Sequence, residues 1–228
     1  DHRDALIPSY AVSEQQFSQH IDWLKNNGFH FINVDQLIKA HQGKYKLPSK
    51  PVLITVDDGY QSFYQHAYPI VRAKNIPIVL AVVGSWLQPK ANQKVDFAGE
   101  SIERNKILSW GELKEMQQSG LVEIASHSYH LHQGIIANPQ GNLEPAAISR
   151  IYHPHSKSYE SDADYQARIY QDLKKNNDLL KEHGIRSPRV MVWPYGRYNM
   201  QLIQTAKQLG MPITITLDDG ADHAKQSL

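Results

Sequence analysis

Short apolar, β-branched runs recur along the chain and alternate with longer stretches that have helical periodicity. Six of these runs predict β-strands, at residues 30–34, 52–56, 78–83, 122–125, 189–193 and 213–217. Most are apolar throughout, as expected for strands of a parallel sheet that is covered on both faces. Strands that alternate with helices predict an α/β fold built from repeated βα units.

Three helices are predicted from capping signals and from the spacing of apolar residues. Ser13 with Gln16 forms a capping box ahead of the first helix, and Ser109 opens a second helix with the same device. The third and longest helix is predicted over residues 162–183, where Gly184 provides a stop. These helices fall between the predicted strands and complete the βα pattern.

Two long segments, residues 84–105 and 127–159, interrupt the alternation. Both follow the C-terminal ends of predicted strands, the edge at which α/β folds place their chemistry. Loops of this length inside a compact domain are usually functional. No repeat or linker divides the chain, so we predict a single domain over residues 1–228. Its ends resemble the interior of a polypeptide, and we expect a domain excised from a longer chain.

The composition limits the possible partners and metal ligands. Lys and Arg (24) nearly balance Asp and Glu (23), so the overall charge predicts neither a nucleic-acid nor an anionic-membrane partner. With 0 Cys and 12 His, imidazole and carboxylate are the strong metal ligands that remain. No apolar run approaches the roughly 20 residues that a membrane span needs, and no signal sequence opens the chain. A mature exported domain has the same appearance.

Two adjacent carboxylates end an apolar strand in the sequence Val56-Asp57-Asp58-Gly59. Two acids at a buried strand end are costly, because desolvation and mutual repulsion raise the pKa of at least one of them unless a cation compensates. The pair therefore predicts a metal site or a proton-transfer role. An ordinary Asp-Asp-Gly turn is the alternative interpretation.

Three histidines, His127, His130 and His132, follow another apolar run. Two imidazoles from such a cluster can bind one cation, whereas a polar loop is the alternative interpretation. Coupled with the aspartates at the end of a neighbouring strand, the cluster favours a metal site.

A buried strand also ends in Trp193-Pro194-Tyr195-Gly196. Such a turn can direct backbone N–H groups at a ligand while its rings line the floor of a pocket. A strand-ending turn with core aromatics is the alternative. A second Asp-Asp-Gly string, at residues 218–220, is predicted to be a turn only.

The three motifs occur in the order found in the polysaccharide deacetylase (NodB-like, carbohydrate esterase family 4) superfamily, which the chain resembles. Within it, the chain looks most like the poly-β-1,6-N-acetyl-D-glucosamine N-deacetylases of biofilm systems, the PgaB and IcaB type. The closer match lies in residues 57–64, 83–86, 125–128 and 192–196. This resemblance covers roughly residues 13–220 and implies an α/β fold that is a distorted or incomplete (β/α) barrel of about seven strands, the NodB homology domain.

The resemblance also implies roles for single residues. Asp57 corresponds to the general base and Asp58 to a metal ligand. Most of the superfamily places its second histidine ligand four residues after the first, where this chain has a leucine. The biofilm deacetylases resemble this chain in placing it five residues on, so the implied ligands are His127 and His132, with His130 as the fallback. Two superfamily motifs are missing, an Asp motif that tunes the base and a late Leu-x-Ile-His motif with the general acid.

The implied reaction is hydrolysis of a linear amide C–N bond in a β-1,6-linked N-acetylglucosamine polymer, a biofilm exopolysaccharide, with release of acetate. One divalent metal ion would activate water and polarise the amide, and zinc, nickel, cobalt and iron all suit this donor set. Asp57 would take the proton, with the backbone near Tyr195 as a candidate oxyanion donor.

The aromatic residues of the motifs predict a substrate groove. Trp86, Trp193 and Tyr195, together with Pro194, are the candidate polymer-binding residues. For Trp86, packing in the fold is an equal alternative. Trp23 and Trp110 are predicted to pack inside the fold.

The family's substrate lies outside the cytoplasm, so we expect an exported protein, periplasmic or associated with the outer membrane. Membrane contact is expected only through an N-terminal anchor outside this chain. Two other functions remain open. A glycan-binding domain without turnover agrees with the missing general-acid motif, and a different metallohydrolase, such as a barrel phosphoesterase or amidohydrolase, would bring more ligands, frequently around two metals.

Overall fold

A computed structural model describes residues 12–90, 92–97 and 99–220. Its centre is a five-stranded sheet of order β13-β12-β7-β4-β3, in which all neighbours are parallel. The strands are β3 (Ile54–Val56), β4 (Ile78–Val82), β7 (Val122–Ser126), β12 (Val190–Val192) and β13 (Ile213–Ile215). The predicted α/β class is confirmed.

A separate two-stranded sheet precedes β3 in the chain. A short strand β1 (His30–Phe31) pairs in parallel with β2 (Pro51–Val52), which runs directly into β3. The expected strand over residues 30–34 is shorter because Asn33 caps an unpredicted helix, α2 (Val34–His41), and forms a capping box with Gln36. The six predicted strand regions thus all occur, compared with the roughly seven strands that the resemblance implied.

The central strand β4 shows how the sheet is buried on both faces. Ile78, Leu80 and Val82 join one hydrophobic cluster, whereas Val79 and Ala81 join another. This alternation of side chains follows from the two-residue period of a strand. The carboxyl ends of β3 and β7, the two neighbours of β4, are therefore held by a packed core on either side.

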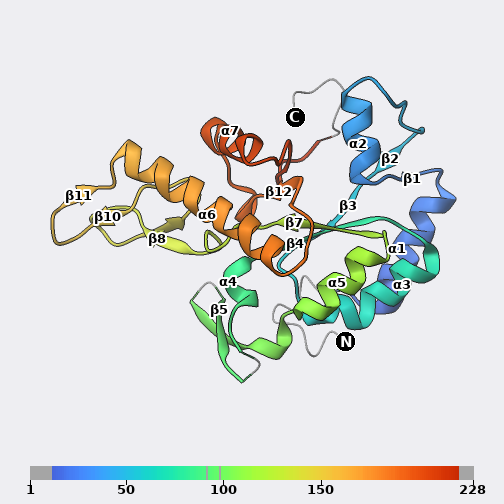
Figure 1. Ribbon diagram of the computed structural model, residues 1–228, viewed down its shortest axis with the longest axis horizontal. Coiled ribbons are helices and arrows are strands. Elements are labelled where there is room, and N and C mark those ends of the chain that lie inside the picture. The colour runs from blue at the N-terminus through green and yellow to red at the C-terminus, as the bar shows by residue number, and fades with distance from the viewer. Residues whose placement is uncertain (1–11, 91, 98, 221–228) are drawn as a thin grey trace.

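Helices cover the sheet in two groups (Figure 1). At one end lie α1 (Glu14–Asn26), α3 (Tyr68–Lys74), which follows a π-helical turn at Phe63–Ala67, and α5 (Trp110–Gln118). At the other end lie α6 (Asp162–Glu182) and α7 (Met200–Gln208). The three predicted helices correspond to α1, α5 and α6. None of the described helices is both long and apolar enough to cross a bilayer.

The two long segments contain structure that periodicity did not predict. The first forms α4 (Gly84–Leu87), the hairpin β5 (Lys94–Phe97) with β6 (Glu100–Glu103), and a 3-10 turn at Arg104–Lys106. The second forms two further hairpins, listed in chain order as β8 (Gly134–Ile136), β9 (Leu143–Pro145), β10 (Tyr152–His153) and β11 (Ser158–Tyr159). These hairpins make an arm that extends from the body of the molecule (Figure 1).

Two tryptophans outside the site differ in their environment. Trp110 is half-buried and stacks on His183 with ring centroids 3.9 Å apart, in agreement with a packing role. Trp23 on α1 is 59% exposed and stacks on Phe29, so the prediction that it packs inside the fold is wrong.

Candidate active site

The candidate site is built from three turns at the carboxyl edge of the sheet. Asp57 and Asp58 follow β3, His127 follows β7, and Tyr195 follows β12. Strands β3 and β7 both flank β4, so the aspartates and His127 lie two strands apart on one edge. The structure thus brings together motifs that are about 70 and 140 residues apart in the sequence.

The Asp-Asp-Gly turn has a strained backbone that aims a carboxylate into the site. Asp58 has φ 73° and Gly59 has φ 79°, and the Gly59 N–H donates to the Asp57 carbonyl at 2.9 Å. A Cβ at Gly59 would lie 2.9 Å from Val82 Cγ1, so the position also requires glycine for space. Ser128 and Tyr195 share the left-handed φ of Asp58, at 71° and 57°. Such strain in non-glycine residues clusters at functional sites.

The carboxylate of Asp58 lies between two imidazoles. Its Oδ1 is 3.5 Å from His127 Nε2 and 3.4 Å from His132 Nε2. Ligand atoms about 2.1 Å from one ion at tetrahedral angles would lie roughly 3.4 Å apart, so the spacing fits a shared cation. His130 stands outside this group, because its exposed ring lies 3.3 Å from Ser85 Oγ through Nδ1.

The proton on His127 can be assigned from its partner. His127 Nδ1 lies 2.8 Å from the Val192 carbonyl oxygen, which only accepts, so Nδ1 carries the hydrogen and donates it. The lone pair is then on Nε2, which faces Asp58. Burial lowers the pKa of His127 to about 4, so the ring is neutral near pH 7. A neutral imidazole with a fixed tautomer is the form that binds a metal.

The two carboxylates are only partly compensated by the protein. Burial raises the pKa of Asp57, and burial raises that of Asp58 to about 6, with a further rise from the charge of Asp57 and opposing effects of His127 and of a hydrogen bond from Tyr60. Oδ1 of each aspartate is buried and has no hydrogen-bond partner among the described residues. A divalent ion would satisfy this uncompensated charge, so the residues present fit a metal.

Comparison with known proteins identifies the family. A family model described as polysaccharide deacetylase matches residues 44–214. The chain belongs to the polysaccharide deacetylase family. A protein of Escherichia coli K12 named poly-β-1,6-N-acetyl-D-glucosamine N-deacetylase is 38% identical to this chain over 226 residues, a match that covers 99% of the chain and 33% of the relative. The chain thus spans about a third of the length of that curated relative.

Solved structures of deacetylases share the fold. The deacetylase domain of BpsB from Bordetella bronchiseptica matches with a TM-score of 0.90 and 41% identity, over 100% of this chain and 89% of that chain. A de-N-acetylase from Aggregatibacter actinomycetemcomitans matches with a TM-score of 0.85 and 41% identity, over 90% of this chain and 78% of that chain. The NodB-like fold that the motifs implied is confirmed.

Aromatic rings surround His132 in the candidate site. The ring centroids of Trp86, Phe97 and Tyr195 lie 5.1, 6.0 and 4.5 Å from that of His132. Tyr195 is 39% exposed, whereas Trp86 and Trp193 are only 2% and 1% exposed. The structure therefore corrects the expectation that Trp86 and Trp193 line an open groove. Both indoles pack in hydrophobic clusters, and Pro194 is buried as well.

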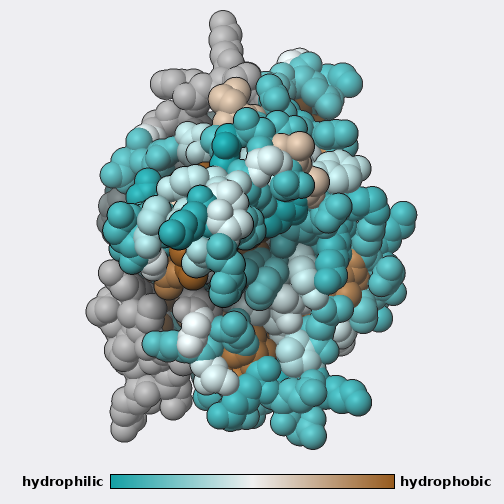
Figure 2. Space-filling view, turned by 90° about the vertical axis from the view of Figure 1, so that its left-hand side faces the viewer, coloured by the Kyte–Doolittle hydropathy of each residue, from teal (hydrophilic) through white to brown (hydrophobic). Residues whose placement is uncertain are grey.

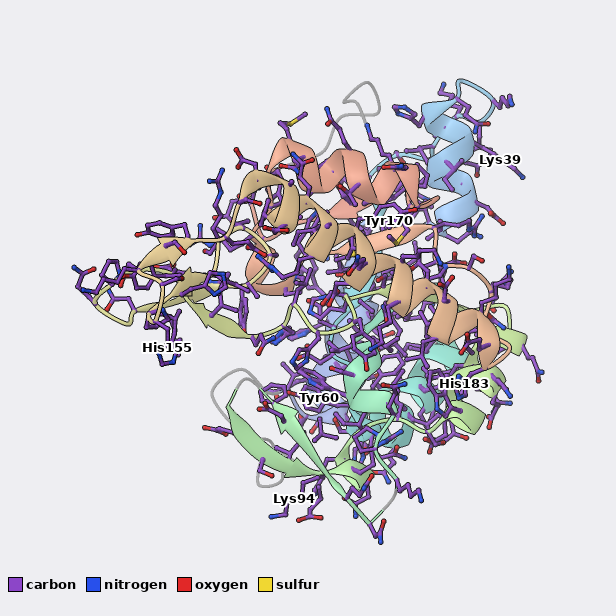
Figure 3. The ribbon with its side chains drawn as sticks, turned by 60° about the vertical axis from the view of Figure 1, so that its left-hand side comes forward. Lys39, Tyr60, Lys94, His155, Tyr170 and His183 are labelled. Carbon is purple, nitrogen blue, oxygen red and sulfur yellow. The ribbon has the colours of Figure 1, made fainter. Side chains whose placement is uncertain are left out.

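Three residues near the site were missed by sequence reasoning. Tyr60 hydrogen-bonds Asp58, and Figure 3 shows it close to α4 and to the β5–β6 hairpin. Phe97 comes from that hairpin and contacts Tyr60 and Trp86, with centroids 5.8 and 4.8 Å apart. Asp172 lies on α6. In the sequence it is a polar residue beside the apolar Leu173, and this was the only signal that could have pointed to it.

The second Asp-Asp-Gly string follows β13 and contributes no ligand atom to the candidate metal group. Asp218 accepts hydrogen bonds from the hydroxyl groups of Tyr198, at 2.9 Å, and Thr216, at 3.1 Å. Residues 216–219 have no regular structure and Gly220 lies at a bend, so the prediction that residues 218–220 form a turn is not confirmed.

Proposed function

We propose that the chain is a metal-dependent N-deacetylase that hydrolyses the N-acetyl groups of a β-1,6-linked N-acetylglucosamine polymer and releases acetate. The observation that carries this proposal is the Asp58 carboxylate placed 3.5 and 3.4 Å from two imidazole Nε2 atoms, next to a second, unpaired carboxylate. The name of the Escherichia coli relative, at 38% identity, supports the substrate class.

Asp58, His127 and His132 would hold one divalent ion, and the grouping of these three ligand atoms supports His132 over His130. When bound, the ion supplies Lewis acidity, which lowers the pKa of water and polarises the acetamide carbonyl. The set of one carboxylate and two imidazoles suits zinc, nickel, cobalt or iron.

Asp57 is the proposed general base. Its Oδ1 has no donor among the described residues, so the carboxylate is free to accept a proton from attacking water. Burial raises its pKa, which makes the ionised group a stronger base. The protonated carboxyl then donates this proton to the departing amine, so that one residue serves both steps.

The turn after β12 offers one backbone donor for the developing oxyanion. Pro194 has no N–H, and the N–H groups of Gly196 and Arg197 donate within the turn to Trp193 and Pro194 at 2.9 and 3.2 Å. The Tyr195 N–H is therefore our candidate donor. The exposed Tyr195 ring is also our candidate contact with the polymer, on a molecule whose arm-bearing face is largely hydrophilic with small separate apolar patches (Figure 2).

The test is release of acetate from β-1,6-linked N-acetylglucosamine oligomers by the metal-loaded, chelated and reconstituted chain. We expect release with metal, loss on chelation, and one ion per chain. Asp57→Asn should retain the ion and lose at least about 100-fold in rate, the scale of a general base. Oligomer binding without any acetate release would identify the glycan-binding alternative instead, and two ions per chain would favour a different metallohydrolase.

We also propose that the protein works outside the cytoplasm, in the periplasm or at the outer membrane, because the proposed polymer lies there. Fractionation of cells that produce the natural full-length protein tests the location. Recovery in the cytoplasmic fraction would contradict it.

A further inference from the structure

The loop between the two candidate histidine ligands needs outside partners. Residues 128–131 have no regular structure, and buried N–H groups without partners are costly. Two of the four N–H groups are satisfied inside the loop, that of Ser128 by Ser126 Oγ at 3.3 Å and that of Leu131 by Ser128 Oγ at 3.0 Å. The N–H groups of Tyr129 and His130 remain.

One carboxylate from α6 accepts both remaining hydrogen bonds. Tyr129 N donates to Asp172 Oδ1 at 2.8 Å, and His130 N donates to Asp172 Oδ2 at 2.9 Å. Burial raises the pKa of Asp172 to about 6, while these two donors act in the opposite direction. The ionised carboxylate and the loop therefore stabilise one another.

A second residue of α6 holds the start of the loop. Asn176, one helical turn after Asp172, is fully buried and donates from Nδ2 to Ser126 Oγ at 2.8 Å. The helix approaches so closely here that a Cβ at Gly84 would lie 2.2 Å from Asn176 Oδ1. A side chain at residue 84 would therefore displace the Asn176 amide from its present position.

The opposite side of the loop is fixed by α4. The N–H groups of Gly84 and Ser85 donate to the carbonyls of Ser128 and Tyr129 at 3.1 and 2.9 Å. The backbone around Tyr129 is thus held from both sides, which keeps Ser128 in its left-handed conformation.

This clamp determines which histidine faces Asp58. With the backbone of Tyr129 and His130 bound to Asp172, the His130 ring points outward and Leu131 enters a hydrophobic cluster. The next residue, His132, then turns its Nε2 towards Asp58. The five-residue spacing of the two histidines follows from this path of the chain.

We propose that Asp172 is a positioning residue of the metal site, which selects His132 over His130 by fixing the backbone between the two ligands. The inference rests on the metal site of the proposed function. Asp172 does not touch the candidate ligand atoms, so it acts through the loop alone.

The test compares Asp172→Asn with Asp178→Asn in the full chain. The first variant keeps the size of the side chain and replaces one acceptor oxygen with an NH2 group. The second makes the same change on the same helix at a half-exposed side chain that pairs with Lys174. We expect Asp172→Asn to weaken Co2+ binding by about 10–100-fold and to change the visible absorption of the bound Co2+, while Asp178→Asn changes neither.

A double-mutant cycle separates positioning from general structural damage. In a His132→Ala background, Asp172→Asn should produce little further loss of Co2+ affinity, because the ligand through which it acts is gone. Wild-type affinity and spectrum in Asp172→Asn overturn the inference and leave the metal site standing. A wild-type chain that binds no Co2+ overturns the proposed function first. If Asp172→Asn does not fold, Asp172→Glu provides the same readouts, and misfolding of both makes Asp172 a folding residue and also overturns the inference.

Discussion

The metal-free site should destabilise the fold, and Asp58→Asn tests this directly. In the folded protein the pKa of Asp58 is raised from 3.8 to about 6, mainly by burial. A shift of about two units corresponds to about 3 kcal/mol, at about 1.4 kcal/mol per unit. That is a large fraction of the 5–15 kcal/mol typical of the free energy of unfolding of a domain.

The sign follows from linkage. Well below pH 3.8 Asp58 is protonated in both the folded and the unfolded chain, so it does not disfavour folding. As the pH rises from 3.8 to about 6 the carboxylate ionises in the unfolded chain but stays protonated in the folded one, and stability is lost across this window. Asn removes this ionisation, so the metal-free variant should be more stable than the metal-free wild type at pH 7 by up to about 3 kcal/mol, with a gain well below about 1 kcal/mol at pH 4.

The assay is urea unfolding followed by circular dichroism, with a chelator present, at pH 4 and pH 7. Saturating metal should reverse the ranking, because the ion stabilises only the wild type. An equal free energy of unfolding for variant and wild type at pH 7, or the same gain at both pH values, would refute the reasoning. Either result would mean that Asp58 is not desolvated as the structure shows.

Three further predictions concern single residues. His132→Ala should weaken metal binding, measured by titration, by more than 100-fold, well beyond the roughly 10–100-fold cost of losing a supporting contact. His130→Ala should leave metal affinity unchanged, and the reverse ranking would make His130 the ligand. The rate of acetate release by the wild-type chain should fall as the pH drops through the raised pKa of Asp57, because the base becomes protonated. A rate that does not depend on pH would exclude Asp57 as the base. Gly196→Ala should lower the free energy of unfolding by at least about 2 kcal/mol, because φ is 64° and the new Cβ would lie 2.6 Å from Leu217 Cβ. The matched control Gly210→Ala, with φ 87° and no described atom within 4 Å, should cost about 1 kcal/mol, and equal losses would exclude the steric cause.

The strands and the motif residues could be predicted because their signals are local. Apolar β-branched runs mark strands of a sheet buried on both faces, and charged or imidazole groups directly after such runs stand out. The parallel arrangement then brings Asp58 and His127 to one edge whatever the details of the loops.

The missed features depend on contacts between distant segments. Asp172 binds the loop at Tyr129, 43 residues away, and no periodicity in the sequence encodes that contact. Phe97 reaches the site only because a hairpin folds back over Trp86. The helix α2 is different, since the Asn33 and Gln36 capping box was present but a strand signal overlapped it.

The burial of aromatic residues could not be derived from their identity. Large rings suit both a hydrophobic core and a sugar-binding surface, and composition does not separate the two. The structure places Trp86 and Trp193 in the core and leaves the Tyr195 ring partly exposed.

The imidazole of His127 also links β7 and β12, two neighbouring strands that share a single register pair. The register of β12 against β7 consists of one pair, Met191 with Ser126, whereas β4 and β7 are paired from Ile78 to Val82. Beside that single pair, the ring of His127 bridges the gap through its bond to the Val192 carbonyl. The imidazole that would bind an ion is therefore also a hydrogen-bonded link between β7 and β12. We expect an ion bound at Nε2 to strengthen the association of these two strands.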